Sequence, residues 1–194
     1  MKRRINKTKK VEAKMKSIKI FLMSAVMLFA VNAQAGVSGA GKGVYPDPAK
    51  MIYVKMETKH GDVVMRLFPD VAPRTVAAFV ERVKEGFYDG IYFHRVIPGF
   101  VAQGGDPTLV GRPAAGYTLP PEFQTRVKHE RGTLAMARTN DINSASTQFY
   151  IAYTSIPHLD GQYTVFGQVE TGMNAVDKIN KGDKMLKVYM VNKQ

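Results

Sequence analysis

The sequence contains no cysteine and no tryptophan, and it has only four histidines. Without thiols the chain cannot be a lipoprotein or form disulfides, thiolate zinc sites or iron–sulfur clusters. The four histidines lie far apart, and none stands at metal-ligand spacing from another. We therefore expect no metal and no cofactor. The histidines are His60, His94, His129 and His158.

Two common catalytic motifs are also missing. The chain has no Gly-x-Ser-x-Gly sequence, which carries the nucleophile of many hydrolases. The pair Gly104-Gly105 is not followed by Lys-Ser or Lys-Thr, so it is not a phosphate-binding loop. A hydrolase is therefore disfavoured.

The formal charge of +12 suggests a nucleic-acid partner, but its distribution argues against one. Residues 1–35 hold nine Lys and Arg and a single acid, Glu12, so this segment carries +8 of the total. The remaining +4 is spread over the rest of the chain, as on an ordinary protein surface. We expect no nucleic-acid partner.

The first 35 residues are typical of an export signal. A basic region runs to Lys19, an apolar run of 12 residues covers 20–31, and Ala33-Gln34-Ala35 follows. A bilayer-spanning helix needs about 20 apolar residues, so an uncleaved anchor is the weaker alternative. We predict cleavage after Ala35 and a periplasmic protein with no stable membrane anchor. A more compact signal follows Met15, which is an alternative start.

The rest of the chain is interpreted as one domain, residues 51–194, behind a mobile Gly- and Pro-rich segment, 36–50. Apolar alternation predicts strands, and a 3.6-residue period predicts a helix from Pro73 to about Glu85. Met173, Val176 and Ile179 predict a second helix that ends near Gly182. The strands are expected at 52–57, 63–68, 132–137, 148–153, 163–170 and 185–191, with two more around the turn Pro98-Gly99 and a long loop at 107–123.

Many short strands, Gly/Pro turns and two separated helices indicate a mostly β protein with a closed or nearly closed barrel. One stretch of it is unusual, because residues 93–106 place an arginine and a glutamine in otherwise apolar runs. Strand alternation would put Arg95 on one face with Phe93 and Ile97. Arg95 is then either a strand-end arginine that reaches solvent or a charged donor aimed into an apolar pocket.

This stretch, Phe93-His94-Arg95-Val96-Ile97-Pro98-Gly99-Phe100-Val101-Ala102-Gln103-Gly104-Gly105-Asp106, resembles the signature of the cyclophilins, a class of peptidyl-prolyl isomerases. Residues 132–138, 146–151, 159–161 and 165–167 agree with it in the same order, and the resemblance covers roughly 52–191. It implies a closed eight-stranded antiparallel barrel with an α-helix over each open end. The chain looks most like the bacterial secreted branch.

Prolyl isomerisation breaks no bond, but it crosses a barrier of about 18–20 kcal/mol through a twisted amide. A donor to the proline nitrogen and a dry apolar slot for the ring would stabilise that transition state. The resemblance implies that Arg95 is the donor and that Gln103 orients it. It also implies that Phe100, Val101, Tyr150 and Leu159 line the slot, that the Arg138 backbone contacts the substrate, and that Ala137, Gln148 and Tyr163 line the groove.

Each of these residues also has an ordinary structural interpretation, as core, as a buried amide or as a wall aromatic. The chain departs from many cyclophilins at three positions. His158 stands where many have a tryptophan at the pocket rim, Tyr163 replaces a histidine, and Tyr150 replaces a phenylalanine. We therefore expect weak cyclosporin binding.

The function expected from these observations is a monomeric exported isomerase that acts on proline-containing polypeptides and assists their folding. The alternative is a holdase chaperone, which binds proline segments without significant turnover. Arg95 beside Phe100 and Gln103 favours the enzyme, because binding alone needs no donor to the proline nitrogen.

Overall fold

The computed structural model describes residues 46–108 and 116–193. The expected export signal, its cleavage site and most of the 36–50 segment lie outside the described residues. At the beginning of the described part, a short 3₁₀ turn, η1 (Pro48–Lys50), is capped by the Asp47 carboxylate, which accepts the Ala49 N–H. Among the described residues no helix is both long and apolar enough to cross a membrane.

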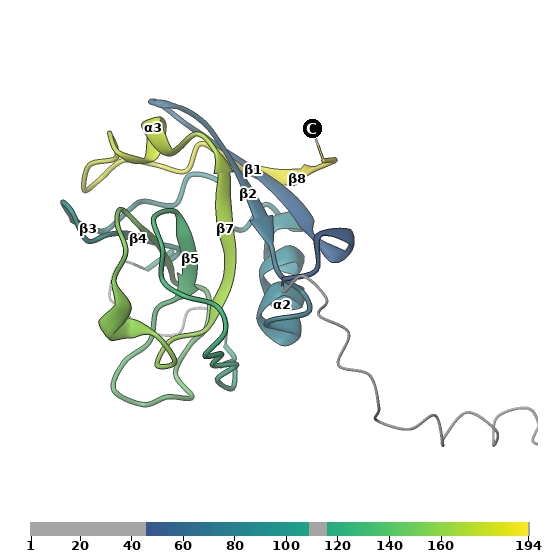
Figure 1. The fold of residues 1–194 in the computed structure, drawn as a ribbon. Coiled ribbons are helices and arrows are strands. Elements are labelled where there is room, and N and C mark those ends of the chain that lie inside the picture. Colours follow the sequence, from purple (N-terminus) through teal and green to yellow (C-terminus); the bar gives the residue numbers. More distant parts are fainter. Residues whose placement is uncertain (1–45, 109–115, 194) are drawn as a thin grey trace, which may run out of the picture. The chain divides into compact units, whose positions relative to one another are not determined.

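The domain is built on one antiparallel sheet of eight strands in the order β3-β4-β6-β5-β7-β2-β1-β8 (Figure 1). All eight strands were predicted, and their bounds differ from the expected ones by a few residues at most. They are β1 (Ile52–Thr58), β2 (Gly61–Leu67), β3 (Arg95–Ile97), β4 (Val101–Gly104), β5 (Thr133–Met136), β6 (Phe149–Ala152), β7 (Val165–Thr171) and β8 (Lys187–Val191).

The expectation of a closed barrel is wrong, because the sheet is an open half-barrel with β3 and β8 at its edges. β3 has only three residues, and it forms no ladder with β8. The segments that precede the two edge strands meet instead: a bridge pairs Tyr92 with Lys184, and four backbone hydrogen bonds link residues 90–93 with residues 182–185. The backbone N–H of Val188 in β8 donates to the Asp89 carboxylate, at 2.8 Å. A side chain therefore accepts the hydrogen bond that this edge N–H would otherwise donate to a neighbouring strand.

Two α-helices accompany the sheet: in Figure 1, α3 (Met173–Val176) lies at the top of the view and α2 (Pro73–Lys84) lies below β1 and β2. α2 was predicted, with proline in its first turn and Val76, Phe79 and Val83 buried against the main core. α3 is a single turn, so the helix predicted to reach Gly182 is wrong in length. Ala175 and Val176 are buried, but hydrogen-bonded turns replace the helix beyond Asp177.

Each sheet face has its own apolar cluster. The larger one is the main core, and it includes Met56, Leu67, Phe149, Ile151 and Phe166, all at most 1% exposed. Strand residues alternate between the faces, so the neighbours of Phe149 and Ile151 in β6 point the other way. Those neighbours, Tyr150 and Ala152, belong to a second and smaller cluster. A second apolar cluster on an outer face positions the candidate site.

Candidate active site

Strand pairing brings residues that are far apart in the sequence into one row on the sheet. Arg95 in β3 is opposite Gln103 in β4, which in turn is opposite Tyr150 in β6. Tyr150 is opposite Ala135 in β5, and Ala135 is opposite Val165 in β7. Side chains of directly opposed residues share a face, so the row carries a guanidinium and an amide at one end and apolar groups at the other.

The apolar part of this row is the floor of a cleft with a volume of about 410 Å³. Val101, Ala135, Tyr150, Ala152, Ile156 and Val165 form the buried cluster under it, and Phe100, Leu159 and Tyr163 pack on that cluster while partly exposed. A half-exposed apolar surface of this kind suits an apolar ligand such as a proline ring. The residues that line the cleft are Arg95, Phe100, Val101, Gln103, Ala137, Arg138, Tyr150, Leu159 and Tyr163.

All nine lining residues belong to the eleven-residue set predicted from the sequence. The other two, Gln148 and His158, do not line the cleft but contact residues that do. The Gln148 Oε1 accepts a hydrogen bond from the Gln103 Nε2 at 3.0 Å. The exposed His158 ring stacks on Phe100, with 5.9 Å between ring centroids and 11° between planes. The predicted residues therefore form one continuous constellation.

Arg95 is more exposed than a donor enclosed by apolar side chains would be. The expected strand face of Phe93, Arg95 and Ile97 is not formed, because β3 begins at Arg95 and Phe93 lies in the main core. Arg95 and Ile97 both face outward. The Arg95 Nη1 donates to the Gln103 Oε1 at 3.3 Å. Arg95 is therefore a strand-end arginine at the cleft wall, held by an amide.

A buried carboxylate that the sequence reasoning missed lies behind Gln103. Asp106 is 1% exposed, and its Oδ2 accepts from the Gln148 Nε2 at 3.2 Å. Its Oδ1 accepts from the backbone N–H and the hydroxyl of Thr108. A chain of hydrogen bonds thus runs from Arg95 through Gln103 and Gln148 to Asp106. The only sequence signal for it is an acid directly after the Gly104-Gly105 pair of the signature.

Close backbone contact places Asp106 at the end of this chain. Gly105 has φ +89°, and a Cβ there would collide with the Thr147 carbonyl oxygen. The contact lets the Thr147 hydroxyl donate to the Gly105 carbonyl at 2.8 Å. A glycine is required here because any other residue would push apart the two segments that carry Asp106 and Gln148.

Tyr150 is held from below the cleft floor by a second buried group. The Tyr150 hydroxyl lies 3.0 Å from the His129 Nε2, and the His129 Nδ1 lies 3.0 Å from the Asp160 Oδ1. Because a carboxylate only accepts, the neutral His129 donates from Nδ1 and accepts the Tyr150 hydroxyl proton at Nε2. The hydroxyl that distinguishes Tyr150 from phenylalanine is therefore directed away from the cleft.

Burial and hydrogen bonding together determine the protonation of Tyr150, His129 and Asp160. Burial lowers the pKa of His129, and the hydrogen bond that the His129 ring donates to the Asp160 carboxylate opposes that effect without cancelling it. Burial also raises the pKa of Asp160, but the hydrogen bonds from His129 and the nearby charge of Lys128 together hold the pKa below its usual value. The Tyr150 pKa is raised, chiefly by burial. A neutral histidine beside an ionised carboxylate follows from these directions.

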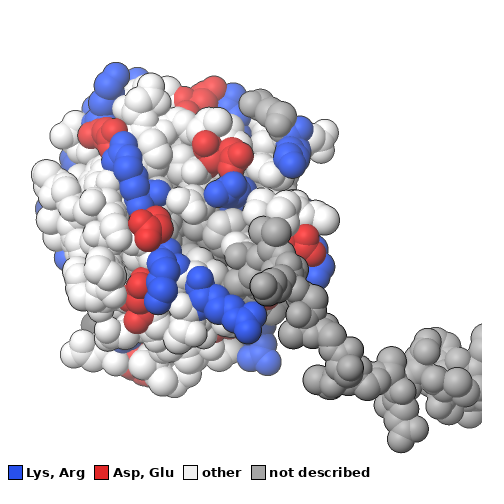
Figure 2. All heavy atoms as spheres, in the orientation of Figure 1, with Lys and Arg blue, Asp and Glu red and all other residues white. Residues whose placement is uncertain are grey.

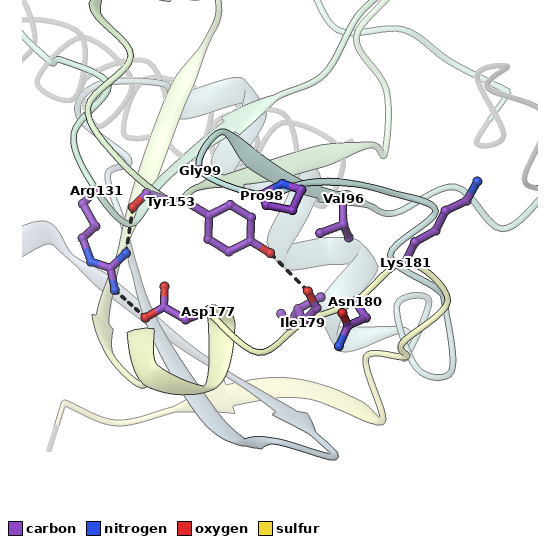
Figure 3. Close-up of a pocket in the computed structure, with 9 residues that line it drawn as sticks. All are labelled: Val96, Pro98, Gly99, Arg131, Tyr153, Asp177, Ile179, Asn180 and Lys181. Atoms are coloured by element: carbon purple, nitrogen blue, oxygen red, sulfur yellow. Dashed lines mark hydrogen bonds and ion pairs between the residues drawn. The ribbon is translucent and has the colours of Figure 1, made fainter.

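A second and larger hollow, about 530 Å³, lies beside the turn that joins β3 and β4 (Figure 3). Three of its polar side chains, those of Arg131, Tyr153 and Asp177, already form hydrogen bonds or an ion pair within it. The Arg131 guanidinium donates to the Tyr153 carbonyl and pairs with Asp177, and the Tyr153 hydroxyl donates to the Ile179 carbonyl. These groups have little remaining capacity for a ligand, so the smaller cleft is the better candidate. Over residues 46–108 and 116–193, no three His, Asp or Glu side chains lie close enough to hold a metal ion.

Comparisons with known proteins agree with this geometry. Residues 53–192 match the family model described as cyclophilin type peptidyl-prolyl cis-trans isomerase. A probable peptidyl-prolyl cis-trans isomerase of Brucella suis is 45% identical over 150 residues, which cover 71% of this chain and 75% of the relative. Peptidyl-prolyl cis-trans isomerase B of Bacillus subtilis is 43% identical over 127 residues, covering 65% and 88% of the two chains.

Solved structures give the same result. A cyclophilin-type isomerase of Cryptosporidium parvum, crystallised in the presence of the dipeptide Ala-Pro, superposes with a TM-score of 0.66 at 29% identity. The superposition covers 73% of this chain and 99% of that structure. The resemblance to the cyclophilin family is thereby confirmed. The chain belongs to the cyclophilin-type peptidyl-prolyl cis-trans isomerases.

Proposed function

We propose that the cleft binds the proline of an X–Pro segment and that Arg95 stabilises the twisted amide. The nitrogen of a twisted amide loses resonance and becomes a better acceptor, so a donor held near it favours the transition state over the planar ground state. The observation that carries this assignment is a guanidinium held by Gln103 beside an apolar floor. The Ala-Pro dipeptide present with the Cryptosporidium cyclophilin supports a proline ligand.

In this mechanism the apolar residues bind and Arg95 acts on the reacting atoms. Phe100, Val101, Tyr150 and Leu159 hold the ring, and the bound ring itself covers the otherwise exposed Arg95. A charged donor acts more strongly once water is excluded. No proton leaves the substrate, so the mechanism needs no base, and the buried His129 serves to hold Tyr150.

The direct test is an isomerisation assay on a proline tetrapeptide with the purified protein. Turnover that saturates with peptide is the expected result. The alternative, a holdase that binds proline segments without turnover, is favoured only by the large apolar floor. It would give peptide binding by calorimetry with no acceleration of isomerisation.

We also propose that the enzyme works on exported proteins in the periplasm. The support comes from the sequence alone, from the basic region, the apolar run at 20–31 and Ala33-Gln34-Ala35. In that compartment, slow X–Pro isomerisation limits the folding of newly exported chains, and an isomerase relieves that step. Cell fractionation, followed by the mass measurement described in the Discussion, tests this location.

A further inference from the structure

Arg138 is a fixed cation at the wall of the cleft. Its guanidinium carbon lies 4.6 Å from the centroid of the Tyr163 ring and 5.9 Å from that of Phe123. Its Nε and Nη2 donate to the Gln162 carbonyl at 3.3 and 3.1 Å, and its Nη1 donates to the Thr139 carbonyl at 2.8 Å. Two rings and two loops therefore hold the group, and little side-chain entropy remains to be lost on binding.

The charge of this guanidinium is not compensated. Every hydrogen bond that Arg138 makes in the described structure goes to a neutral carbonyl, the weakest being that to Asn140 at 3.5 Å. These four contacts use at most four of the five N–H groups of a guanidinium, so at least one donor remains. Arg95 likewise donates to an amide, and over the described residues neither arginine has a carboxylate within ion-pair distance.

Three acids lie near the lining residues in sequence, and in the described part of the chain none of them forms an ion pair with Arg138. Asp106, behind Gln103, accepts from Gln148 and Thr108. Asp160 follows Leu159 but binds His129 and lies 3.5 Å from the Lys128 Nζ. Asp141, on the loop after Arg138, accepts the Asn143 N–H. The cleft therefore has two arginines and no acid among its lining residues. Figure 2 shows basic and acidic side chains interspersed over the face of the protein that it draws.

We propose that this cleft prefers prolines flanked by an acidic residue, and that Arg138 determines the preference. The proposal rests on the proposed function, since it concerns the substrate of the same site. While Arg95 acts on the proline, a carboxylate one or two residues away can accept the remaining N–H of Arg138. A substrate carboxylate would also give Arg138 the ion-pair partner that the described residues do not provide.

The test measures kcat/KM by NMR exchange, which needs no coupling protease with preferences of its own. Two peptide series with neutral ends vary the residue before and the residue after the proline, through Glu, Gln and Lys. Because exposed charge pairs contribute modestly, we expect kcat/KM for the Glu peptide to exceed that for the Gln peptide by about two- to fivefold in at least one series. In that series kcat/KM for the Lys peptide should be lower than that for the Gln peptide. The Glu:Gln ratio should approach one when ionic strength rises from about 0.01 M to about 1 M, where the Debye length falls from about 30 Å to about 3 Å.

Two variants test whether Arg138 determines the preference for an acidic residue. In Arg138→Gln the Glu:Gln ratio should fall toward one, whatever happens to the rate on the Gln peptide. Arg74→Gln on α2 removes the same charge from a residue that does not line the cleft, and it should keep the wild-type ratio. A wild-type ratio of one or less in both series, or a ratio that survives Arg138→Gln, overturns the proposal. Turnover of the Gln peptides tests isomerase function separately, because a chain that turns over no peptide contradicts that function itself.

Discussion

The Gln148 side-chain amide donates from Nε2 to the buried Asp106 carboxylate at 3.2 Å, and this contact orients every amide between Asp106 and Arg95. A carboxylate can only accept, so Gln148 must present its NH₂ group to Asp106 and its oxygen to Gln103. Gln103 must then turn its own oxygen toward Arg95, as it does. Asp106 is therefore a positioning residue for the guanidinium, although it does not line the cleft.

We predict that Asp106→Asn reduces kcat more than it changes KM. An asparagine can donate as well as accept, so the two glutamines can invert, and an inverted Gln103 would point donors at the donors of Arg95. Misplacement of this kind should reduce kcat/KM by about tenfold. Kinetics of the folded variant measure it, and Thr108→Ala, which keeps the carboxylate, is the matched control. In an Arg95→Ala background Asp106→Asn should have little further effect on kcat, and a full additional loss would show that Asp106 acts by another route.

The sequence predicts the strands well, because alternation is a local pattern, whereas the residues of the cleft follow from the resemblance to the cyclophilin signature. Alternation places Val101 and Tyr150 on the face opposite Ala102 and Phe149, and the register then brings Gln103 between Arg95 and Tyr150. The role of Asp106 could not be predicted in the same way. Its partner Gln148 is 42 positions away, and only the close contact of Gly105 with Thr147 brings the two together.

The closed barrel and the length of the second helix are the two errors in the predicted fold, and side-chain hydrogen bonds are found at both places. The strand pattern predicts a closed barrel, whereas the sheet is open, and at its β8 edge the Asp89 side chain accepts the Val188 N–H, a contact that no strand pattern reveals. The apolar period continues to Ile179, and it therefore predicts a second helix that ends near Gly182. Ile179 is indeed buried, but hydrogen bonds among Asn180, Asp183 and their neighbours hold that segment in turns. Periodicity indicates which residues are buried and does not always indicate which backbone structure buries them.

Stability should fall as the pH drops below 6.5, in part because of His129. The folded-state pKa of His129 lies below its ordinary value of 6.5, chiefly because the ring is buried. Between the two pKa values the unfolded chain binds the proton and the folded chain does not, so acid favours unfolding in that window. The pKa of His94 is lowered by burial in the same direction. Urea unfolding across this range measures the effect. The slope should be smaller in His129→Gln and in His94→Gln, and a wild-type stability that rises as the pH falls would contradict the argument.

Cyclosporin should bind more weakly than to relatives with tryptophan at the position of His158. The His158 ring stacks on Phe100 but does not line the cleft, and an imidazole covers less apolar surface than an indole. We expect His158→Trp to increase cyclosporin affinity, as measured by calorimetric titration. His158→Phe is the control for ring area without an N–H donor. Tight binding by the wild type, unchanged in His158→Trp, would contradict this expectation.

Export predicts a defined mature protein. If signal peptidase cleaves after Ala35, intact-mass measurement on the periplasmic fraction should give the mass of residues 36–194, with Gly36 first. A substitution of Ala35 by a bulky residue should slow processing, because the peptidase requires small residues at that position. Full-length protein in the membrane fraction of wild-type cells would contradict the cleavage prediction.

Arg95→Ala should impair catalysis and leave the fold nearly intact. In the folded chain Arg95 is exposed and makes one side-chain hydrogen bond, to Gln103, so its removal should change the free energy of unfolding by less than about 1 kcal/mol. A charged hydrogen bond to the proline nitrogen in a cleft covered by substrate is worth about 1.5–3 kcal/mol or more. At about 1.4 kcal/mol per decade, kcat/KM should fall at least about tenfold.

Two further variants separate the donor from the slot. Arg95→Lys should restore little activity, because a compact ammonium on a flexible stem cannot keep the planar geometry that Gln103 holds. Phe100→Ala removes part of the slot, so it should weaken peptide binding and raise KM, whereas Arg95→Ala should act mainly on kcat. Melting temperature and activity must be measured on the same samples. If Arg95 were only a structural residue, Arg95→Ala would lower the melting temperature and each folded molecule would isomerise peptide at the wild-type rate, and that result would exclude Arg95 as the donor.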